Sequence, residues 1–445
     1  MKFLGIGEYC DLGALYSRLI EAGHEVKVYV ENPDYHEIYK GILSFTPDWR
    51  LELDWIRQAG SDGIILFESA SKGPEQDALR EDGFQVIGGS SFGDKLEADR
   101  DYGQQILQEI GMSIAKTFRF YDYDSAINFI QETNQRYVFK SNNVNSDRTR
   151  NYIAMAEDGS DLAALLKDYQ NKITRNPIGR SDQIDFVLME FISGIEIGVG
   201  AYFNGEHFLE PACLDWEHKR FFPGNLGELT GEMGTVVTFQ GSDIIFQRTL
   251  LKLENRLKAS GYCGYINLNI MANREGLWPL EFTSRFGYPG YAICAALQQD
   301  SWDILFFKML KKTTLFIETH RGFAIGIVLT VPPFPYSFGY EKLSKGLPIL
   351  FQPSFTENNQ RYLHLSEVAK LDGKLVTSGM TGNVATAVGI GSSIEIARSQ
   401  SYKLAAKVIV PNVRYRHDVG ASLIAGDLQQ LVDWGYIDSS ILEFV

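Results

Sequence analysis

The sequence has little cysteine, no long apolar run and no surplus of basic residues. Its four cysteines (Cys10, Cys213, Cys263 and Cys294) are far apart and form no Cys-x-x-Cys pair. We therefore expect buried thiols in a reducing cytosol rather than a disulfide framework or a zinc site. No window reaches the roughly 18 apolar residues that a membrane span needs. The apolar run after Met1 is too short for a signal peptide, so we expect a soluble, cytoplasmic protein.

The charge balance is acidic, with 42 Lys and Arg against 56 Asp and Glu, a formal net charge of −14. Such a surface repels phosphate backbones and anionic lipid, so neither a nucleic-acid nor a membrane partner is expected. A local basic pocket for one small phosphorylated ligand remains compatible with it. Hydrophobic residues make up 44% and charged residues 22%, which excludes a disordered or collagen-like chain. At roughly 150 residues per domain, 445 residues predict about three domains.

The first 90 residues alternate strand and helix patterns. Strands are expected at Lys2–Gly7, His24–Val30, Gly63–Phe67 and Phe84–Gly88, with a helix at Leu12–Ala22. This alternation predicts a parallel α/β sheet whose ligands lie at the carboxyl ends of the strands. Gly7 and Glu8 are at that edge and are candidate substrate contacts. The Gly-Ile-Gly at 5–7 is a weak dinucleotide signal, because Cys10 stands where a third glycine is needed, and no nicotinamide is expected.

The remaining chain divides by its patterns. A charged helix is expected from Asp94 to Gly111, a strand pair turned at Ser193-Gly194 within 187–203, and a helix at Phe246–Ser260. A hairpin is expected at 265–282, strands predominate after Lys312, and a helix follows at 393–406. The predicted domains are 1–92 (N-terminal α/β), 93–320 (with a lid at about 113–185), 321–422 (strand-rich) and a C-terminal extension at 423–445.

Two segments have the chemistry of a nucleotide site. Lys140 closes a strand and precedes a polar loop that contains Arg148, so its cations can pair with phosphate oxygens. Residues Glu190–Ile192 can present one backbone N–H and C=O to an adenine edge, and Glu196 can accept ribose hydroxyls. Read alone, the first segment is more typical of a solvated loop and the second of an ordinary strand and turn.

Two further segments complete the set. His218, Lys219 and Arg220 precede a loop with four glycines that includes Thr230 and Gly231, and cations with nearby backbone N–H groups suit phosphate or an acyl phosphate. Farther along, Glu281 and Thr283 alternate on one predicted sheet face. These oxygen ligands suit Mg²⁺, while Arg285 continues that face and can hold a carboxylate. Alone, this segment also fits a core strand with one paired acid.

Together these segments resemble the ATP-grasp superfamily and, within it, the phosphoribosylamine–glycine ligase (glycinamide ribonucleotide synthetase) family of purine synthesis. The 218–220 and 230–234 segments are similar to the family's DHKR and NTGGMG, and Glu281–Gly287 is similar to EFNxRFG. Segments 377–384 and 415–420 resemble TxGGRV and YRxDIG. The resemblance runs to about residue 420. It implies an ATP-grasp fold with an N-terminal pre-ATP-grasp domain, a lid subdomain and a strand-rich C-terminal domain.

The resemblance also implies a chemistry and a set of roles. An ATP- and Mg²⁺-dependent ligase of this family activates a carboxylate, such as that of glycine, as an acyl phosphate, and an amine then forms the amide. By resemblance, Arg100, Lys140 and Arg148 contact ATP phosphates, residues 190–192 hold adenine, and Glu196 accepts the ribose. His218 and Lys219 touch the γ-phosphate, Glu281 holds Mg²⁺, and Arg285 steadies the acyl phosphate.

The sequence departs from the family pattern mainly at substrate positions. Residues Glu8–Leu12 replace a glycine-rich GGREHA-like turn that grips phosphoribosylamine, and Thr283 replaces a metal-binding asparagine, for which Asn267 or Asn269 can compensate. A ligase for a different amine and a nucleotide-binding relative without catalysis therefore stay open. Arg416 and Asp418 either face the second substrate or form a salt bridge. The sequence is silent on oligomeric state, and a homodimer would be unsurprising.

Overall fold

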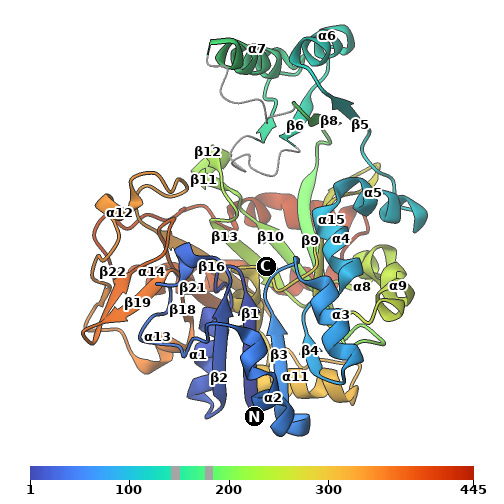
Figure 1. Cartoon of the computed structure of the whole chain (residues 1–445). Coiled ribbons are helices and arrows are strands. Elements are labelled where there is room, and N and C mark those ends of the chain that lie inside the picture. Colours follow the sequence, from blue (N-terminus) through green and yellow to red (C-terminus); the bar gives the residue numbers. More distant parts are fainter. Residues whose placement is uncertain (142–150, 176–183, 445) are drawn as a thin grey trace.

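The computed structural model describes residues 1–141, 151–175 and 184–444. Three parts are visible in Figure 1: an N-terminal α/β unit in blue, a small lid that projects above the body, and a large body. The body is built on a long sheet whose strands come from distant parts of the chain. Among the helices in these residues, none combines the length and apolarity that a bilayer crossing requires. All four cysteines are buried free thiols.

The N-terminal unit is a four-stranded parallel sheet in the order β2-β1-β3-β4, as the alternating pattern predicts. Its edge after β1 and β3 carries Glu8 and Glu68. The strands and their helices are β1 (Lys2–Gly7), α1 (Gly13–Glu21), β2 (Glu25–Val30), α2 (Leu53–Gln58), β3 (Gly63–Phe67), α3 (Gly73–Glu81) and β4 (Gln85–Ile87).

The helix expected at 94–111 is two helices, α4 (Ser91–Ala98) and α5 (Arg100–Glu109). The break lies at Asp99, whose backbone is extended and whose carboxylate accepts the N–H of Tyr102 at 3.0 Å. An aspartate at this position is a strong N-cap, and it restarts the helix with Arg100 as the first residue of α5. The prediction of one continuous helix is therefore wrong at this point.

The lid is a four-stranded antiparallel sheet in the order β5-β8-β6-β7. Two helices cover it through an aromatic core that includes Phe118, Phe129, Phe139 and Phe186. Its elements are β5 (Thr117–Phe120), α6 (Tyr123–Thr133), β6 (Tyr137–Ser141), β7 (Tyr152–Ile153), α7 (Ser160–Arg175) and β8 (Phe186–Glu190). Lys140 lies near the end of β6. Arg148 lies outside the described residues.

The body is organised by an eight-stranded sheet in the order β15-β14-β9-β10-β13-β16-β21-β18, with antiparallel neighbours throughout. This sheet contains strands from before and after residue 320, where a domain boundary is predicted. The predicted domain boundaries therefore stay predictions. Its strands are β9 (Ile195–Phe203), β10 (Cys213–Glu217), β13 (Gly234–Thr238), β14 (Gly264–Asn273), β15 (Gly276–Thr283), β16 (Phe323–Thr330), β18 (Leu363–Leu365) and β21 (Asn383–Gly391).

Two sequence expectations in the body need correction. Residues 191–194 do not form a hairpin turn, because β8 belongs to the lid sheet and β9 to the body sheet, and the segment links the two. The helix expected at 246–260 is interrupted. Thr249 leaves helical geometry (φ −129°, ψ −97°) and its hydroxyl donates to the Ile245 carbonyl at 2.6 Å. The pieces are α8 (Asp243–Arg248), a short 3-10 turn and α9 (Glu254–Ala259).

The remaining elements pack around this sheet. The predicted hairpin of β14 and β15 and the helix at 394–405 are present, the latter capped by Ser393. Smaller elements are β11 (Arg220–Phe222), β12 (Leu226–Leu229), α10 (Gly290–Ala295), α11 (Trp302–Lys311), α12 (Tyr340–Leu343), β17 (Leu350–Phe351), α13 (Glu357–Arg361), β19 (Val368–Leu371), β20 (Lys374–Thr377), α14 (Ile394–Ala405), β22 (Val408–Ile409) and α15 (Leu428–Asp433).

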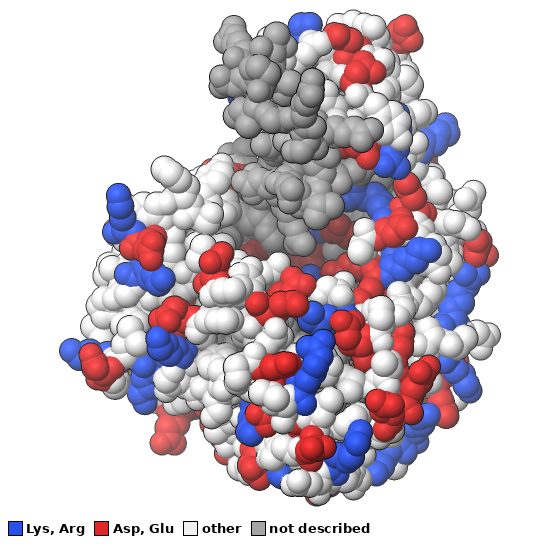
Figure 2. Space-filling model, viewed as in Figure 1, with Lys and Arg blue, Asp and Glu red and all other residues white. Residues whose placement is uncertain are grey.

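The largest apolar clusters cover both faces of the body sheet. One contains Ile197, Val199 and Leu268 and includes Leu428 and Leu431 of α15, so the C-terminal extension covers core. Another joins the N-terminal sheet to α10 and α11 through residues such as Leu15 and Phe306. On the face seen in Figure 2, acidic and basic side chains are interspersed. This packing fixes the edges of both sheets relative to each other.

Candidate nucleotide and acyl-transfer site

Three glutamates from separate strands meet one lysine. The Nζ atom of Lys219, which follows β10, lies 2.7 Å from Glu196 Oε1, 3.2 Å from Glu217 Oε2 and 3.3 Å from Glu281 Oε1. The three carboxylates come from β9, β10 and β15. The predicted residues Glu196, Lys219 and Glu281 are thus brought into contact, although 85 positions separate the first from the last (281 − 196).

Strand register explains this convergence. β14 lies between β9 and β15, and it pairs Asn269 with Glu281 and Asn267 with Thr283. Side chains two residues apart in a strand share a face, so these four candidate metal ligands lie on one side of the sheet. The same alternation places Glu217 and Lys219 together at the end of β10.

The electrostatics of the cluster are strongly coupled. Burial opposes the charge of Lys219, but the three glutamates outweigh it and raise its pKa well above the ordinary value. Lys219, followed by Lys140 and Arg100, lowers the pKa of Glu281 to about 2 against the effect of burial. Burial, with Arg100 and Lys219, lowers the pKa of Lys140 to about 8. Arg100 and Lys140 therefore act on the same cluster, as the sequence predicts.

Two more carboxyls lie next to this cluster, and sequence reasoning missed them together with Glu217. Asp215 is 6% exposed and accepts the Asn267 amide at 2.6 Å. Burial and then Glu217 raise its pKa to about 8. Glu232 accepts the Thr235 hydroxyl, and burial with Glu217 and Asp215 raises its pKa. The sequence signal for Asp215 and Glu217 was their spacing from Lys219, because positions 215, 217 and 219 share one face of a strand.

The oxygen groups fit a magnesium ion bound together with phosphate. Among the residues described, no group of three His, Cys, Asp or Glu side chains is arranged to hold a metal by itself. Glu281 is half exposed, and Asn269 donates its amide nitrogen to Glu217 at 3.1 Å, which leaves its carbonyl oxygen for another partner. Mg²⁺ usually takes only one or two protein carboxylates and completes its shell with water and phosphate oxygens. This donor set suits that mode.

Arg285 lies beyond the end of β15 and is held by α4. Its Nε donates to Glu97 Oε1 at 3.0 Å, and Glu97 also accepts the backbone N–H of Ser284 at 2.8 Å. Burial opposes the charge of Arg285, but Glu97 and then Asp11 raise its pKa, with Glu217 contributing. The guanidinium therefore stands between the N-terminal edge and the glutamate cluster, where a carboxylate substrate would need a cation.

His218 makes its ring contacts with backbone atoms, and its predicted contact with the γ-phosphate stays a prediction. Its Nε2 accepts the Gly420 N–H at 3.1 Å, and its Nδ1 lies 3.2 Å from the Trp216 carbonyl. Burial and then Arg416 lower its pKa to about 4. Because His218 alternates with Lys219, it faces the C-terminal segment, and its ring nitrogens are engaged by backbone. The structure gives it a packing role.

Arg416 and Asp418 form the salt bridge that the sequence left open. Arg416 is 2% exposed, and its Nε donates to Asp418 at 2.5 Å. Arg416 also donates to the Arg220 carbonyl at 2.9 Å and to Asn225 at 2.8 Å. Asp418 accepts the Gly224 N–H at 2.8 Å. The pair therefore anchors the β11–β12 hairpin, and a contact with the second substrate stays a prediction.

The predicted substrate residues Arg220, Thr230 and Gly231 lie at the same hairpin, whereas Gly7 and Glu8 lie at the N-terminal sheet edge. Arg220 donates to the Gly227 carbonyl at 2.7 Å. Thr230 donates both its N–H (2.8 Å) and its hydroxyl (2.7 Å) to the Lys219 carbonyl, which fixes the lysine backbone. A Cβ added at Gly231 would meet no atom within 4 Å. Gly231 therefore borders open space.

The predicted adenine hinge, Glu190–Ile192, crosses from lid to body. The N–H groups of Glu190 and Phe191 donate to the carbonyls of Lys116 and Arg136, at 2.9 and 3.3 Å. The Arg136 guanidinium stacks on the Phe191 ring at 3.7 Å. The hinge is therefore fixed to the lid through its first two residues.

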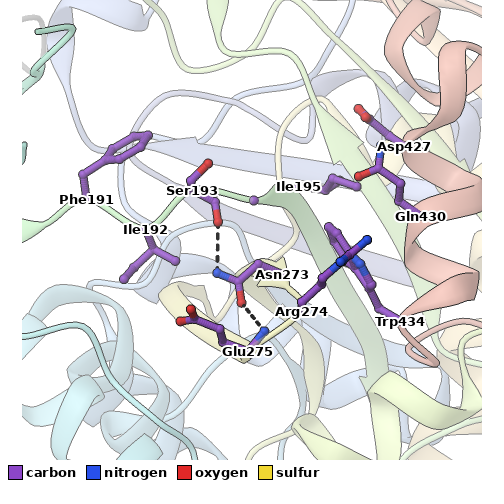
Figure 3. Close-up of a pocket in the computed structure, with 11 residues that line it drawn as sticks. Phe191, Ile192, Ser193, Ile195, Asn273, Arg274, Glu275, Asp427, Gln430 and Trp434 are labelled. Carbon is purple, nitrogen blue, oxygen red and sulfur yellow. Dashed lines mark hydrogen bonds between the residues drawn. The ribbon is translucent and has the colours of Figure 1, made fainter. Parts of the chain in front are cut away.

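A pocket of about 590 Å³ lies behind this hinge (Figure 3). It is bounded by residues 191–195, by the β14–β15 turn at 273–275 and by Trp434 of the C-terminal extension. The Asn273 amide donates to the Ser193 carbonyl at 3.0 Å across it (Figure 3). Ile195 and Glu196 are consecutive in β9 and point to opposite faces, so this pocket does not contain the Lys219 cluster.

Several known proteins are similar to this chain in sequence. Residues 98–291 match the family model described as phosphoribosylglycinamide synthetase, ATP-grasp (A) domain. A phosphoribosylamine–glycine ligase from Listeria innocua is 23% identical over 439 residues, covering 94% of this chain and 99% of that protein. One from Pasteurella multocida is 26% identical over 362 residues, covering 78% of this chain and 80% of that protein.

Solved structures show the same fold. The phosphoribosylamine–glycine ligase of Thermotoga maritima superposes with a TM-score of 0.68 at 22% identity, covering 94% of this chain and 100% of that one. The biotin carboxylase domain of Hydrogenobacter thermophilus 2-oxoglutarate carboxylase, solved with MgADP and bicarbonate, gives 0.62 at 11% identity, covering 99% and 97%. The chain therefore has the ATP-grasp fold, its residues 98–291 are similar to the ATP-grasp (A) domain of phosphoribosylglycinamide synthetase, and it resembles phosphoribosylamine–glycine ligases over most of its length.

Proposed function

We propose that this chain is an ATP- and Mg²⁺-dependent carboxylate–amine ligase. It activates a carboxylate as an acyl phosphate, and an amine then displaces phosphate to form an amide, with ADP as the other product. One observation carries the proposal: Lys219 gathers Glu196, Glu217 and Glu281 within 3.3 Å, in a cluster that Arg100 and Lys140 also influence. Phosphoryl transfer needs this combination of cations and metal ligands in one place.

The geometry of the cluster supports the following roles. Arg100, Lys140 and Lys219 would hold the phosphates, Glu196 the ribose, and Ile192 the adenine edge. Glu281 with Asn269 would hold Mg²⁺, which neutralises charge on the phosphate oxygens when bound. Nucleotide binding would replace the Lys219 ion pairs with equivalent contacts to ligand. Arg285, held by Glu97, would orient the carboxylate and steady its acyl phosphate.

The partners of this reaction are small molecules: ATP, a carboxylate such as glycine, and an amine. The relatives in the comparison are named for phosphoribosylamine and glycine. A cytoplasmic location and a homodimeric state belong to the same proposal, and sedimentation equilibrium of the full chain tests the latter.

An ADP-release screen over amino acids and amines tests the proposal. We expect release that requires MgATP, one carboxylate and one amine together. Glu281→Gln should lower turnover sharply, to a small residual rate, while the chain stays folded, and Glu275→Gln, an exposed glutamate of the adjacent turn, should not. No ADP release with any pair would contradict the ligase. Equal nucleotide affinity in wild type and Glu281→Gln, without turnover in either, would favour a nucleotide-binding relative instead.

A further inference from the structure

The N-terminal edge, where a phosphorylated amine would need backbone donors, is already occupied by a side chain of the protein. Glu68 follows β3 directly, and its backbone N–H donates to Ile6 of β1 at 3.0 Å. It is 1% exposed. Its carboxyl group therefore lies inside the sheet edge, beside the turn that leads from β1 into α1.

Glu68 takes the donors that an anion would use there. Its Oε2 accepts the N–H of Asp11 at 2.8 Å, and its carboxyl also bonds the N–H of Leu12, the residue before α1. The Tyr16 hydroxyl donates to Oε1 at 2.7 Å. Free N–H groups at a helix N-terminus are the usual protein site for phosphate. Here an internal carboxyl group satisfies them.

The space is filled as well as the hydrogen bonds. A Cβ added at Gly7 would lie 2.3 Å from Glu68 Oε2, and one at Gly5 would lie 2.3 Å from the Tyr16 ring. One at Gly13 would lie 2.1 Å from the Tyr39 ring. Glycines in a phosphate-binding turn let the ligand approach the backbone. In this turn they let buried side chains approach instead.

The charge around the edge also disfavours phosphate. Asp11 acts on Glu68 and, after burial, is the main cause that raises the Glu68 pKa to about 8. Lys72, at the start of α3, is paired with Glu31 at 2.7 Å. Glu8 stands in the same turn. A doubly charged phosphate ester placed here would meet acids rather than free cations.

We propose that Glu68 is a specificity-determining residue and that the amine substrate of this ligase carries no phosphate ester. The inference rests on the proposed ligase function and deepens it: the acceptor class is an unphosphorylated amine, such as an amino acid. The internal carboxyl group mimics the phosphate at the α1 N-terminus, so a phosphorylated amine has neither room nor donors.

A binding experiment tests this separately from catalysis. The full chain, with its nucleotide site saturated by MgADP, is titrated calorimetrically with ribose 5-phosphate as the probe. We expect no detectable binding of ribose 5-phosphate to wild type or to Glu25→Ala, which removes an exposed charge at the far end of β2. For Glu68→Ala we expect binding at least tenfold tighter than the weakest affinity that the titration detects. Binding to wild type overturns the proposal. A folded Glu68→Ala with unchanged MgADP affinity and no ribose 5-phosphate binding also overturns the role of Glu68.

A substrate experiment covers the case in which Glu68→Ala does not fold. Wild-type ADP release is compared between phosphoribosylamine generated in place and a panel of unphosphorylated amines, each with the same carboxylates. Higher turnover with an unphosphorylated amine supports the proposal, and a preference for phosphoribosylamine overturns it. If no amine gives ADP, the ligase function fails, while the wild-type titration with ribose 5-phosphate still decides whether the edge excludes phosphate.

Discussion

Ionisable side chains at two sheet edges of this molecule have opposite environments. At the end of β10, Lys219 is paired with three glutamates, of which Glu281 is half exposed. At the end of β3, Glu68 is sealed at 1% exposure by its own donors. At the Lys219 cluster, a ligand can replace the internal ion pairs, because its side chains reach solvent. At Glu68, no exposed side chain is available for a ligand to replace a contact.

This difference separates the chemistry of the proposed nucleotide site from the choice of the acceptor amine. A cluster with several cations and carboxylates within ion-pair distance can bind a magnesium triphosphate by replacing one set of partners with another. A buried carboxyl group on helix N–H donors has no such alternative, because leaving it unpaired costs about 1–3 kcal/mol. In the proposed ligase the open cluster would support catalysis, and the filled edge would restrict the substrate.

The largest expected effect is at Lys219. Lys219→Ala removes the cation shared by three carboxylates, which would then repel both each other and phosphate. Turnover should fall about 10²–10³-fold, as for loss of one group that stabilises a charged transition state. ADP-release kinetics measure it, with Lys312→Ala as the control because that lysine pairs with Glu206 at 2.8 Å on the surface. A loss below tenfold would remove Lys219 from the catalytic cluster.

The next effect is on magnesium. Glu281→Gln replaces the carboxylate ligand by a neutral amide, so the Mg²⁺ concentration for half-maximal turnover should rise at least about 10–100-fold. Titration of residual ADP release with MgCl₂ measures this shift. An unchanged magnesium requirement at reduced turnover would show that Glu281 acts through Lys219 and not on the metal.

A pH effect should follow from Lys140. Its folded pKa of about 8 means that its charge is lost above that value, so the free protein binds phosphate less well there. MgATP affinity should weaken above pH 8 by at most about tenfold per pH unit. Calorimetric titrations at pH 7, 8 and 9 measure it, and Lys140→Arg should flatten the profile because arginine stays charged. An identical slope in Lys140→Arg would assign the titration to another group.

The filled edge predicts a smaller effect, on stability. Glu68 has a folded pKa of about 8, above the unfolded value of 4.5. The folded state therefore binds more protons between these values, and the free energy of unfolding should fall as pH rises from 5 to 8. The slope for one group is at most about 1.4 kcal/mol per pH unit. Urea unfolding of Glu68→Gln should show a flatter profile. An unchanged profile would mean that Glu68 does not titrate in this range.

Much of the fold and the open cluster could be predicted from the sequence, because the signals are local. The N-terminal alternation, the β14–β15 hairpin and the basic run at 218–220 are short patterns, and they lie where they were expected. The resemblance assigned both His218 and Lys219 to the γ-phosphate, although strand alternation points their side chains to opposite faces. Local patterns could not show that residues 191–194 link two sheets, since a turn and a hinge have the same composition.

The parts that escaped prediction depend on register between distant strands. Glu68 fills the turn after β1 only because β1 and β3 are adjacent and parallel, with Ile6 opposite Phe67. Glu217 and Asp215 join the cluster because β14 places Asn269 and Asn267 beside them. Thr249 interrupts a well-patterned helix through a backbone conformation that the apolar spacing does not reveal. Tertiary packing decided each case.

The most direct measurement is a crystal structure of the full chain with Mg²⁺ and a non-hydrolysable ATP analogue. We expect the triphosphate between Lys140 and Glu281, with the Lys219 ammonium moved from its glutamates to phosphate oxygens and the metal on Glu281. A nucleotide bound elsewhere, such as in the pocket behind the hinge beside Trp434, with the Lys219 ion pairs intact, would contradict the account.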